Sequence, residues 1–145
     1  GFRLSNMSAI LLLEYELSQK QERGELPDNS ALITTIVSTD MTKAIAKSYN
    51  ATEFETLTGF KWIGEKMRQF ETDNSYSFQF GFEESYGCVI GTHARDKDAI
   101  VATMALCEAA AYYKSQGKTL WEAMIDMYEK YGYYIDAIQS VGIYE

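Results

Sequence analysis

The run Ala-Leu-Ile-Thr-Thr-Ile-Val at residues 31–37 constrains the fold of this chain most strongly. It is too short for a typical helix, and it is rich in the β-branched residues that favour strands. No charged residue interrupts it, so the run predicts a strand that is buried on both faces. Strands of this kind belong to parallel sheets, whose crossover connections cover both faces with helices.

Helical and strand patterns alternate along the rest of the sequence. Apolar stripes, caps and breakers predict helices at residues 7–21, 41–50, 58–70, 99–116 and 119–132, and further strands at residues 52–57, 77–82 and 88–92. Helices separate the first three strands, which should be parallel, whereas a tight connection makes the fourth strand antiparallel. We therefore expect an α/β fold, a three-layer α/β/α sandwich around a small, mostly parallel four-stranded sheet.

The same patterns make predictions about packing. Alternation along the third strand places Phe78, Phe80 and Phe82 on one face of the sheet. The helix at residues 99–116 is apolar on almost every side, so we expect it to be deeply buried. Ser38 or Thr39 should cap the second helix.

The composition limits the classes of function. A chain of 145 residues that is 46% hydrophobic fits one domain with a substantial core. Its net charge of −8 provides no basic stripe, so nucleic acid is not an expected partner. The single histidine, His93, and two cysteines without CxxC spacing build no typical metal site. Cys88 and Cys107 should be buried free thiols in a reducing compartment.

Three polar loops should follow the carboxyl ends of the parallel strands, where open α/β sheets bind ligands. They span residues 38–40, 57–61 and 81–87. In the second loop Gly59 opens a helix, so we expect backbone N–H groups there to be free to meet an anion or a hydroxyl.

The third loop contains two glutamates and a serine between glycines. Glu83 and Glu84 are neighbours on an extended strand and should point to opposite faces, which makes a paired acid and base improbable. Glu83 and Ser85 point the same way, and together they accept and donate hydrogen bonds. That pair suits neighbouring sugar hydroxyls, although the spacing alone fits a solvated turn as well.

A charged turn at residues 92–98 precedes the apolar helix. Arg95 and Lys97 oppose the helix macrodipole there, because a helix N-terminus prefers acids. This placement fits either a phosphate-binding turn or an ordinary charged turn.

Four stretches taken in order resemble the third domain of the α-D-phosphohexomutases, the phosphoglucomutase/phosphomannomutase family. They are TLTGFKWIGEKM, FQFGFEESYG, HARDKDAI and EAAAYYKSQGKTLWEAM. The resemblance extends over residues 4–132 and is closest to the bacterial phosphoglucomutase branch, which also resembles phosphopentomutases. The ordered series TGFK, FEES and RDKD is specific to this family.

The resemblance implies a role for five residues of this chain. Glu83 and Ser85 correspond to the family's ligands of the sugar hydroxyls. Thr58 and Gly59 correspond to a loop that touches the sugar, and Lys97 to the lysine that approaches the bound phosphosugar. No catalytic or metal-binding residue is expected in this chain.

The resemblance also implies a four-domain isomerase of carbohydrate metabolism, which interconverts sugar 1-phosphates and 6-phosphates through a bisphosphate intermediate. Its phosphoserine, its Mg²⁺ loop and its main phosphate loop would lie in the other three domains, because their motifs are missing here. Mg²⁺ and glucose 1,6-bisphosphate would serve the full-length enzyme, and the isolated domain would be inactive. Phe60 occupies a position where relatives carry Trp or His.

These patterns predict a sugar-binding domain at residues 1–132 and an extended linker toward a further domain at residues 133–145. The start at Gly1 without a Met suggests an excised domain of a cytoplasmic enzyme, and the apolar run at residues 9–13 is too short to span a membrane. The alternatives are a separate sugar-phosphate-binding module, a phosphopentomutase domain, or a small hydrolase that uses Ser85 and His93. The sequence does not distinguish glucose, mannose and pentose phosphates.

Overall fold

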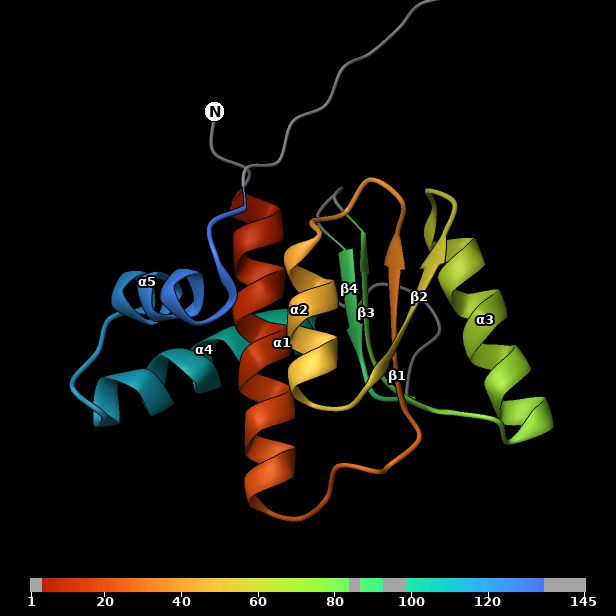
Figure 1. The fold of residues 1–145 in the computed structure, drawn as a ribbon, viewed down its shortest axis with the longest axis horizontal. Helices are drawn as coiled ribbons and strands as arrows, with labels where there is room; N and C mark the ends of the chain where they lie inside the picture. The colour runs from red at the N-terminus through yellow and green to blue at the C-terminus, as the bar shows by residue number, and fades with distance from the viewer. Residues whose placement is uncertain (1–3, 84–86, 93–98, 135–145) are drawn as a thin grey trace, which may run out of the picture.

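The computed structural model describes residues 4–83, 87–92 and 99–134 of the chain. Within these residues five helices and four strands alternate in the expected order (Figure 1). The helices are α1 (Leu4–Glu22), α2 (Met41–Ser48), α3 (Phe60–Asp73), α4 (Ala99–Ser115) and α5 (Leu120–Tyr131). The strands are β1 (Ser30–Thr35), β2 (Thr52–Thr56), β3 (Ser77–Glu83) and β4 (Gly87–Ile90).

The sheet has the strand order β2-β1-β3-β4. Strand β1 pairs in parallel with both β2 and β3, and β4 runs antiparallel to β3, as the connection lengths predict. Helix α3 covers one face of the sheet, and α1 and α2 cover the other (Figure 1). The expected α/β fold is therefore confirmed.

Two separate cores fill the space on the two faces of the sheet. The face under α3 buries Ile33 with Ile63 and Met67. The opposite face buries Leu32 together with residues of α1, α2, α4 and α5. Because neighbours along β1 enter different cores, this central strand is buried on both sides, as its apolar run predicts.

A β-bulge in β3 contradicts the expectation that its three phenylalanines share a face. Ala31 of β1 is opposite Phe78, but the next residue, Leu32, is opposite Phe80, so Gln79 is an extra residue. Since side chains alternate along a strand, one extra residue reverses every face that follows. Phe78 consequently lies in the core under α3, whereas Phe80 and Phe82 lie in the opposite core.

Helix α4 is not deeply buried, contrary to its apolar composition. It contacts β4, α1 and α5 along one side, where Ala105 and Ala109 are buried. Its other side exposes Ile100 and Met104, which are 74% and 66% accessible. An evenly apolar helix has no polar stripe to identify its outer face, so composition overestimated its burial.

Other local predictions were partly correct. The buried run ends at Thr35, and Ile36 is 59% exposed. Asp40, not Ser38 or Thr39, is the N-cap of α2, and it makes no side-chain capping bond. Cys88 is half-buried and Cys107 is exposed, so neither is the buried thiol that we expected.

A buried carboxylate joins three helices on the side of the sheet opposite α3. Glu14 of α1, 8% exposed, accepts hydrogen bonds from the hydroxyls of Tyr49 and Tyr131 at 2.7 and 2.6 Å. It also accepts a hydrogen bond from Lys130 Nζ at 3.0 Å. These three donors follow α2 or belong to the end of α5, so one carboxylate fixes α1, α2 and α5 together.

The buried tyrosines should make the fold sensitive to alkali. Burial, and then a hydrogen bond to Glu108, raises the pKa of Tyr15 from 10.0 to about 12. Burial is also the main cause that raises the pKa of Tyr49, Tyr113 and Tyr131. A folded-state pKa above the unfolded value stabilises the fold below the unfolded pKa, and that stability is lost as the pH rises.

We therefore expect the free energy of unfolding to fall between pH 10 and pH 12, measured by urea unfolding at a series of pH values. Tyr15→Phe should flatten this fall. Tyr133→Phe is the matched control, because Tyr133 is 74% exposed, and it should leave the pH profile unchanged. A stability that is constant over this range would contradict the expectation.

Candidate functional site

The parallel strands β1, β2 and β3 end at the same edge of the sheet, at the top of Figure 1. The loops at residues 36–40 and 57–59 leave the sheet at this edge, and helices α2 and α3 begin there. The expected position of the polar loops is therefore correct for the described residues. Helix N-termini and strand carboxyl ends together form the usual ligand-binding edge of an open α/β sheet.

Glu83 lies at this edge as the last residue of β3, and it is only 6% exposed. Its Oε2 accepts a hydrogen bond from the backbone N–H of Gly59, with an N···O distance of 3.2 Å. The bulge at Gln79 determines this orientation, because without the extra residue Glu83 would point to the opposite face of the sheet. Two loops that are distant in sequence thus meet at one carboxylate.

Gly59 is the N-cap of α3 and adopts φ 114° and ψ 128°. This positive φ favours glycine, because residues with a Cβ rarely adopt it. The Gly59 N–H is engaged by Glu83, so it is not the unoccupied donor that the sequence predicted. No residue of α3 supplies an acid to its first turn or a side-chain cap, so Glu83 provides the negative charge that this helix end favours.

The neighbours of Gly59 point in different directions. Thr58 is exposed at the edge, where a ligand can reach it. Phe60 is 8% exposed and packs in the core under α3. Its side chain therefore supports the helix, whereas Thr58 is exposed and Gly59 is half-buried.

The first loop is largely occupied by its own hydrogen bonds. The Ser38 hydroxyl lies 2.9 Å from the hydroxyl of Thr35 and accepts the Thr35 backbone N–H. Thr39 is buried, and Asp40 pairs with Lys43 at 2.9 Å. This loop shapes the edge of the sheet without presenting a cluster of polar groups.

Two of the five predicted site residues, Ser85 and Lys97, lie outside the described residues. The same holds for Glu84, Arg95 and His93, and for residues 135–145 of the expected linker. The structure therefore brings together Thr58, Gly59 and Glu83, and it is these three that define the candidate site.

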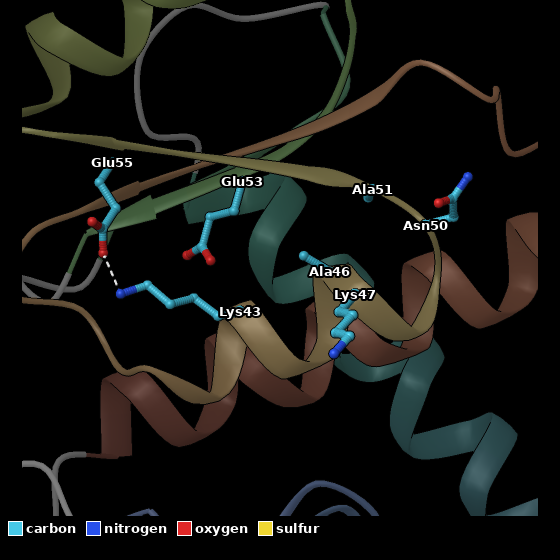
Figure 2. A pocket seen from close by; sticks show the side chains of 7 residues that line it. All are labelled: Lys43, Ala46, Lys47, Asn50, Ala51, Glu53 and Glu55. Atoms are coloured by element: carbon cyan, nitrogen blue, oxygen red, sulfur yellow. Dashed lines mark ion pairs between the residues drawn. The ribbon is translucent and has the colours of Figure 1, made fainter.

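A hollow that sequence reasoning missed lies between α2 and β2 (Figure 2). Its volume is about 500 Å³, and it is lined by Lys43, Ala46, Lys47, Asn50, Ala51, Glu53 and Glu55. Figure 2 shows the Glu53 carboxylate pointing from β2 toward α2, while Lys43 reaches Glu55 at 2.9 Å. The sequence signal for it is Glu53, a glutamate within the predicted strand at residues 52–57.

Glu53 is held in this hollow by two hydroxyls. Its Oε1 accepts hydrogen bonds from Thr34 at 2.9 Å and from Thr42 at 2.6 Å. Burial raises the pKa of the Glu53 carboxyl, and the two threonine hydrogen bonds oppose that increase. These contacts tie α2 to β1 and β2, and none of the predicted site residues lines the hollow.

Within residues 4–83, 87–92 and 99–134, no group of three or more His, Cys, Asp or Glu side chains is arranged to hold a metal ion. None of the described helices has the length and apolarity needed to cross a membrane.

Comparison with known proteins identifies the family. Residues 5–131 match the family described as phosphoglucomutase/phosphomannomutase, alpha/beta/alpha domain III. The chain belongs to this family. The resemblance of its TGFK, FEES and RDKD motifs is thereby confirmed, and so is the expected assignment to the third domain.

Individual relatives agree with this assignment. The chain is 36% identical over 130 residues to a phosphoglucomutase of Staphylococcus haemolyticus, covering 90% of this chain and 23% of the relative. It is 38% identical over 117 residues to glucose 1,6-bisphosphate synthase of Homo sapiens, covering 81% and 19%. The chain thus spans about a quarter or less of these relatives.

A solved structure supports the fold. The open form of the Paramecium phosphoglucomutase pp63/parafusin superposes with a TM-score of 0.64 at 22% identity. The superposition covers 89% of this chain and 21% of that one.

Proposed function

We propose that this phosphoglucomutase/phosphomannomutase domain recognises the sugar in an isomerase that interconverts sugar 1-phosphates and 6-phosphates through a bisphosphate intermediate. Glu83 and Ser85 bind sugar hydroxyls, Thr58 and Gly59 border the sugar, and Lys97 approaches the bound phosphosugar. The main support is the position of Glu83, whose buried carboxylate lies at the ligand-binding edge beside Gly59. Holding the sugar in place is a large part of catalysis when a phosphoryl group is transferred.

The remaining chemistry belongs, in this proposal, to other parts of a longer polypeptide. They supply the phosphoryl donor, the site for Mg²⁺ and the main phosphate loop, while glucose 1,6-bisphosphate serves the complete enzyme. This chain by itself orients the sugar and is inactive. The cytoplasmic location and the boundary between a domain at residues 1–132 and a linker at residues 133–145 stay predictions.

A glucose phosphate is the substrate class that the comparisons favour. Two relatives with 36% and 38% identity carry names that refer to glucose phosphates. In glucose and in mannose the 3- and 4-hydroxyls are equatorial, so the one pair of Glu83 and Ser85 serves both sugars. Galactose has an axial 4-hydroxyl, which would leave a buried carboxylate oxygen without its donor.

The test is the affinity of this chain for three sugar 1-phosphates, measured by NMR titration. Glucose and mannose 1-phosphate should bind with a Kd on the order of millimolar, because few contacts must offset the entropic cost of association. Galactose 1-phosphate should bind about fivefold to 150-fold more weakly, since an unpaired buried acceptor costs roughly 1–3 kcal/mol. Glu83→Gln should reduce this preference for glucose over galactose.

Glu55→Gln is the matched control, because Glu55 is a more exposed glutamate of the neighbouring strand β2 and is paired with Lys43. It should leave the preference intact. If Glu83→Gln keeps the ratio of the two affinities while binding remains measurable, Glu83 is not the residue that recognises the 4-hydroxyl.

Two alternatives make different predictions in the same titration. A separate sugar-phosphate-binding module would bind glucose 1-phosphate far more tightly than millimolar, since no other domain would share the ligand. A phosphopentomutase domain would prefer ribose 1-phosphate to glucose 1-phosphate.

A further inference from the structure

We propose that Gly59 acts on the sugar through Glu83, as a positioning residue for the carboxylate that recognises the hydroxyls. Its N–H holds one carboxylate oxygen, and its left-handed backbone directs that N–H back toward β3. This inference rests on the proposed function, because the sugar is the ligand that the positioned carboxylate meets.

A hydrogen bond between Gly59 and Glu83 orients the carboxylate. The Gly59 N–H donates to Glu83 Oε2 at 3.2 Å, across 24 positions of sequence. A glutamate side chain has three rotatable bonds, and a donor on its terminal oxygen selects one arrangement of them. A carboxylate has about four lone-pair positions on its two oxygens, so one carboxylate can accept both an N–H and a hydroxyl.

The backbone conformation of Gly59 favours glycine at this position. Its φ of 114° is unfavourable for any residue with a Cβ. Among the described residues space is not the constraint, because the nearest atom to a Cβ built at Gly59 would be Trp62 Cδ1 at 3.8 Å. A side chain at this position would therefore act by changing the backbone, which turns the N–H away from Glu83, and not by a clash with the described protein atoms.

The contact between Gly59 and Glu83 lies at the start of α3. Helix α3 has no acid in its first turn and no side-chain cap, so Glu83 is the charge that complements this end. The carboxylate is thus oriented before any sugar arrives, and orientation of this kind determines how well a hydroxyl can be distinguished by its stereochemistry.

The first experiment measures the contact without a sugar. Hydrogen exchange of the Gly59 amide is followed by NMR in this chain and in Glu83→Ala, Glu83→Gln and Glu55→Ala. We expect Glu83→Ala to speed exchange by about tenfold or more, the loss of one hydrogen bond to a charged acceptor. Glu83→Gln, which keeps a side-chain oxygen, should recover part of the protection, and Glu55→Ala should change nothing. An exchange rate unaffected by Glu83→Ala overturns the proposal, whatever the chain binds.

The second experiment is a double-mutant cycle on binding of glucose 1-phosphate and galactose 1-phosphate. Gly59→Ala should weaken glucose 1-phosphate about threefold to tenfold and reduce the preference for glucose, because a misdirected carboxylate distinguishes hydroxyls poorly. In the Glu83→Ala background the same change should have almost no further effect. If instead the two substitutions change the Kd independently, so that their fold-changes multiply, Gly59 contacts the sugar directly and the positioning role is overturned.

The two experiments separate this inference from the proposed function. If neither sugar phosphate binds but Glu83→Ala still speeds hydrogen exchange of the Gly59 amide, the proposed sugar recognition is wrong. The contact between Gly59 and Glu83 is then still established. If both sugars bind and Gly59→Ala lowers the two affinities equally, the effect is general loss of structure, and the positioning role is wrong.

Discussion

Replacing Glu14 with alanine should lower the free energy of unfolding by about 2–4 kcal/mol, because two tyrosine hydroxyls lose a charged acceptor in the interior. The substitution leaves the hydroxyls of Tyr49 and Tyr131 without this acceptor, and it removes the counter-charge of Lys130, whose side chain is 52% exposed. Because Glu14 is only 8% exposed, water does not easily replace the missing carboxylate. The effect is a large fraction of the stability of a domain of this size.

Urea unfolding followed by circular dichroism measures this loss. Glu14→Gln should cost less, about 1–3 kcal/mol, because its amide keeps one oxygen as an acceptor. The control is Glu55→Ala, which breaks a more exposed ion pair with Lys43 and should cost at most about 1 kcal/mol. Equal losses for Glu14→Ala and Glu55→Ala would mean that the network adds nothing beyond a surface ion pair.

Replacing Phe80 with alanine should cost about 3–5 kcal/mol, since this side chain is among the largest that are fully buried in the core. Its partner on the same face is Phe82, whose ring centroid lies 6.2 Å away in an edge-on arrangement. Phe78 is as close to Phe80 in sequence as Phe82 is, but the bulge places Phe78 in the core under α3. Phe80 should therefore be energetically coupled to Phe82 and not to Phe78.

Two double-mutant cycles with the milder change to leucine test this arrangement. The pair of Phe80 and Phe82 should show a coupling of about 0.5–1.5 kcal/mol, the range of aromatic pairs. The pair of Phe78 and Phe80 should be additive within about 0.5 kcal/mol, because the two side chains share no core partner. If Phe78 and Phe80 were coupled as strongly as Phe80 and Phe82, all three rings would lie on one face of the sheet. That result would contradict the bulge at Gln79.

Local sequence determined the element types and their order. The apolar run at residues 31–37 predicted the central strand. A threonine followed three residues later by a glutamate is the sequence pattern of a capping box, and Thr119 and Glu122 form one at the start of α5. The tight connection before β4 predicted its antiparallel direction. Such features depend on residues close together in the chain, so a pattern in the sequence is sufficient to identify them. The ordered motifs likewise identified the family.

Only the tertiary structure decided which face each part of these elements presents. The bulge at Gln79 arises from the pairing of β3 with β1, and one extra residue there reversed the faces of Phe80, Phe82 and Glu83. The outer side of α4 is likewise set by which elements pack against it, since its composition is apolar all round. The contact between Gly59 and Glu83 combines both effects: it needs a left-handed residue at the start of α3 and the bulged register of β3, and neither is encoded in the spacing between them.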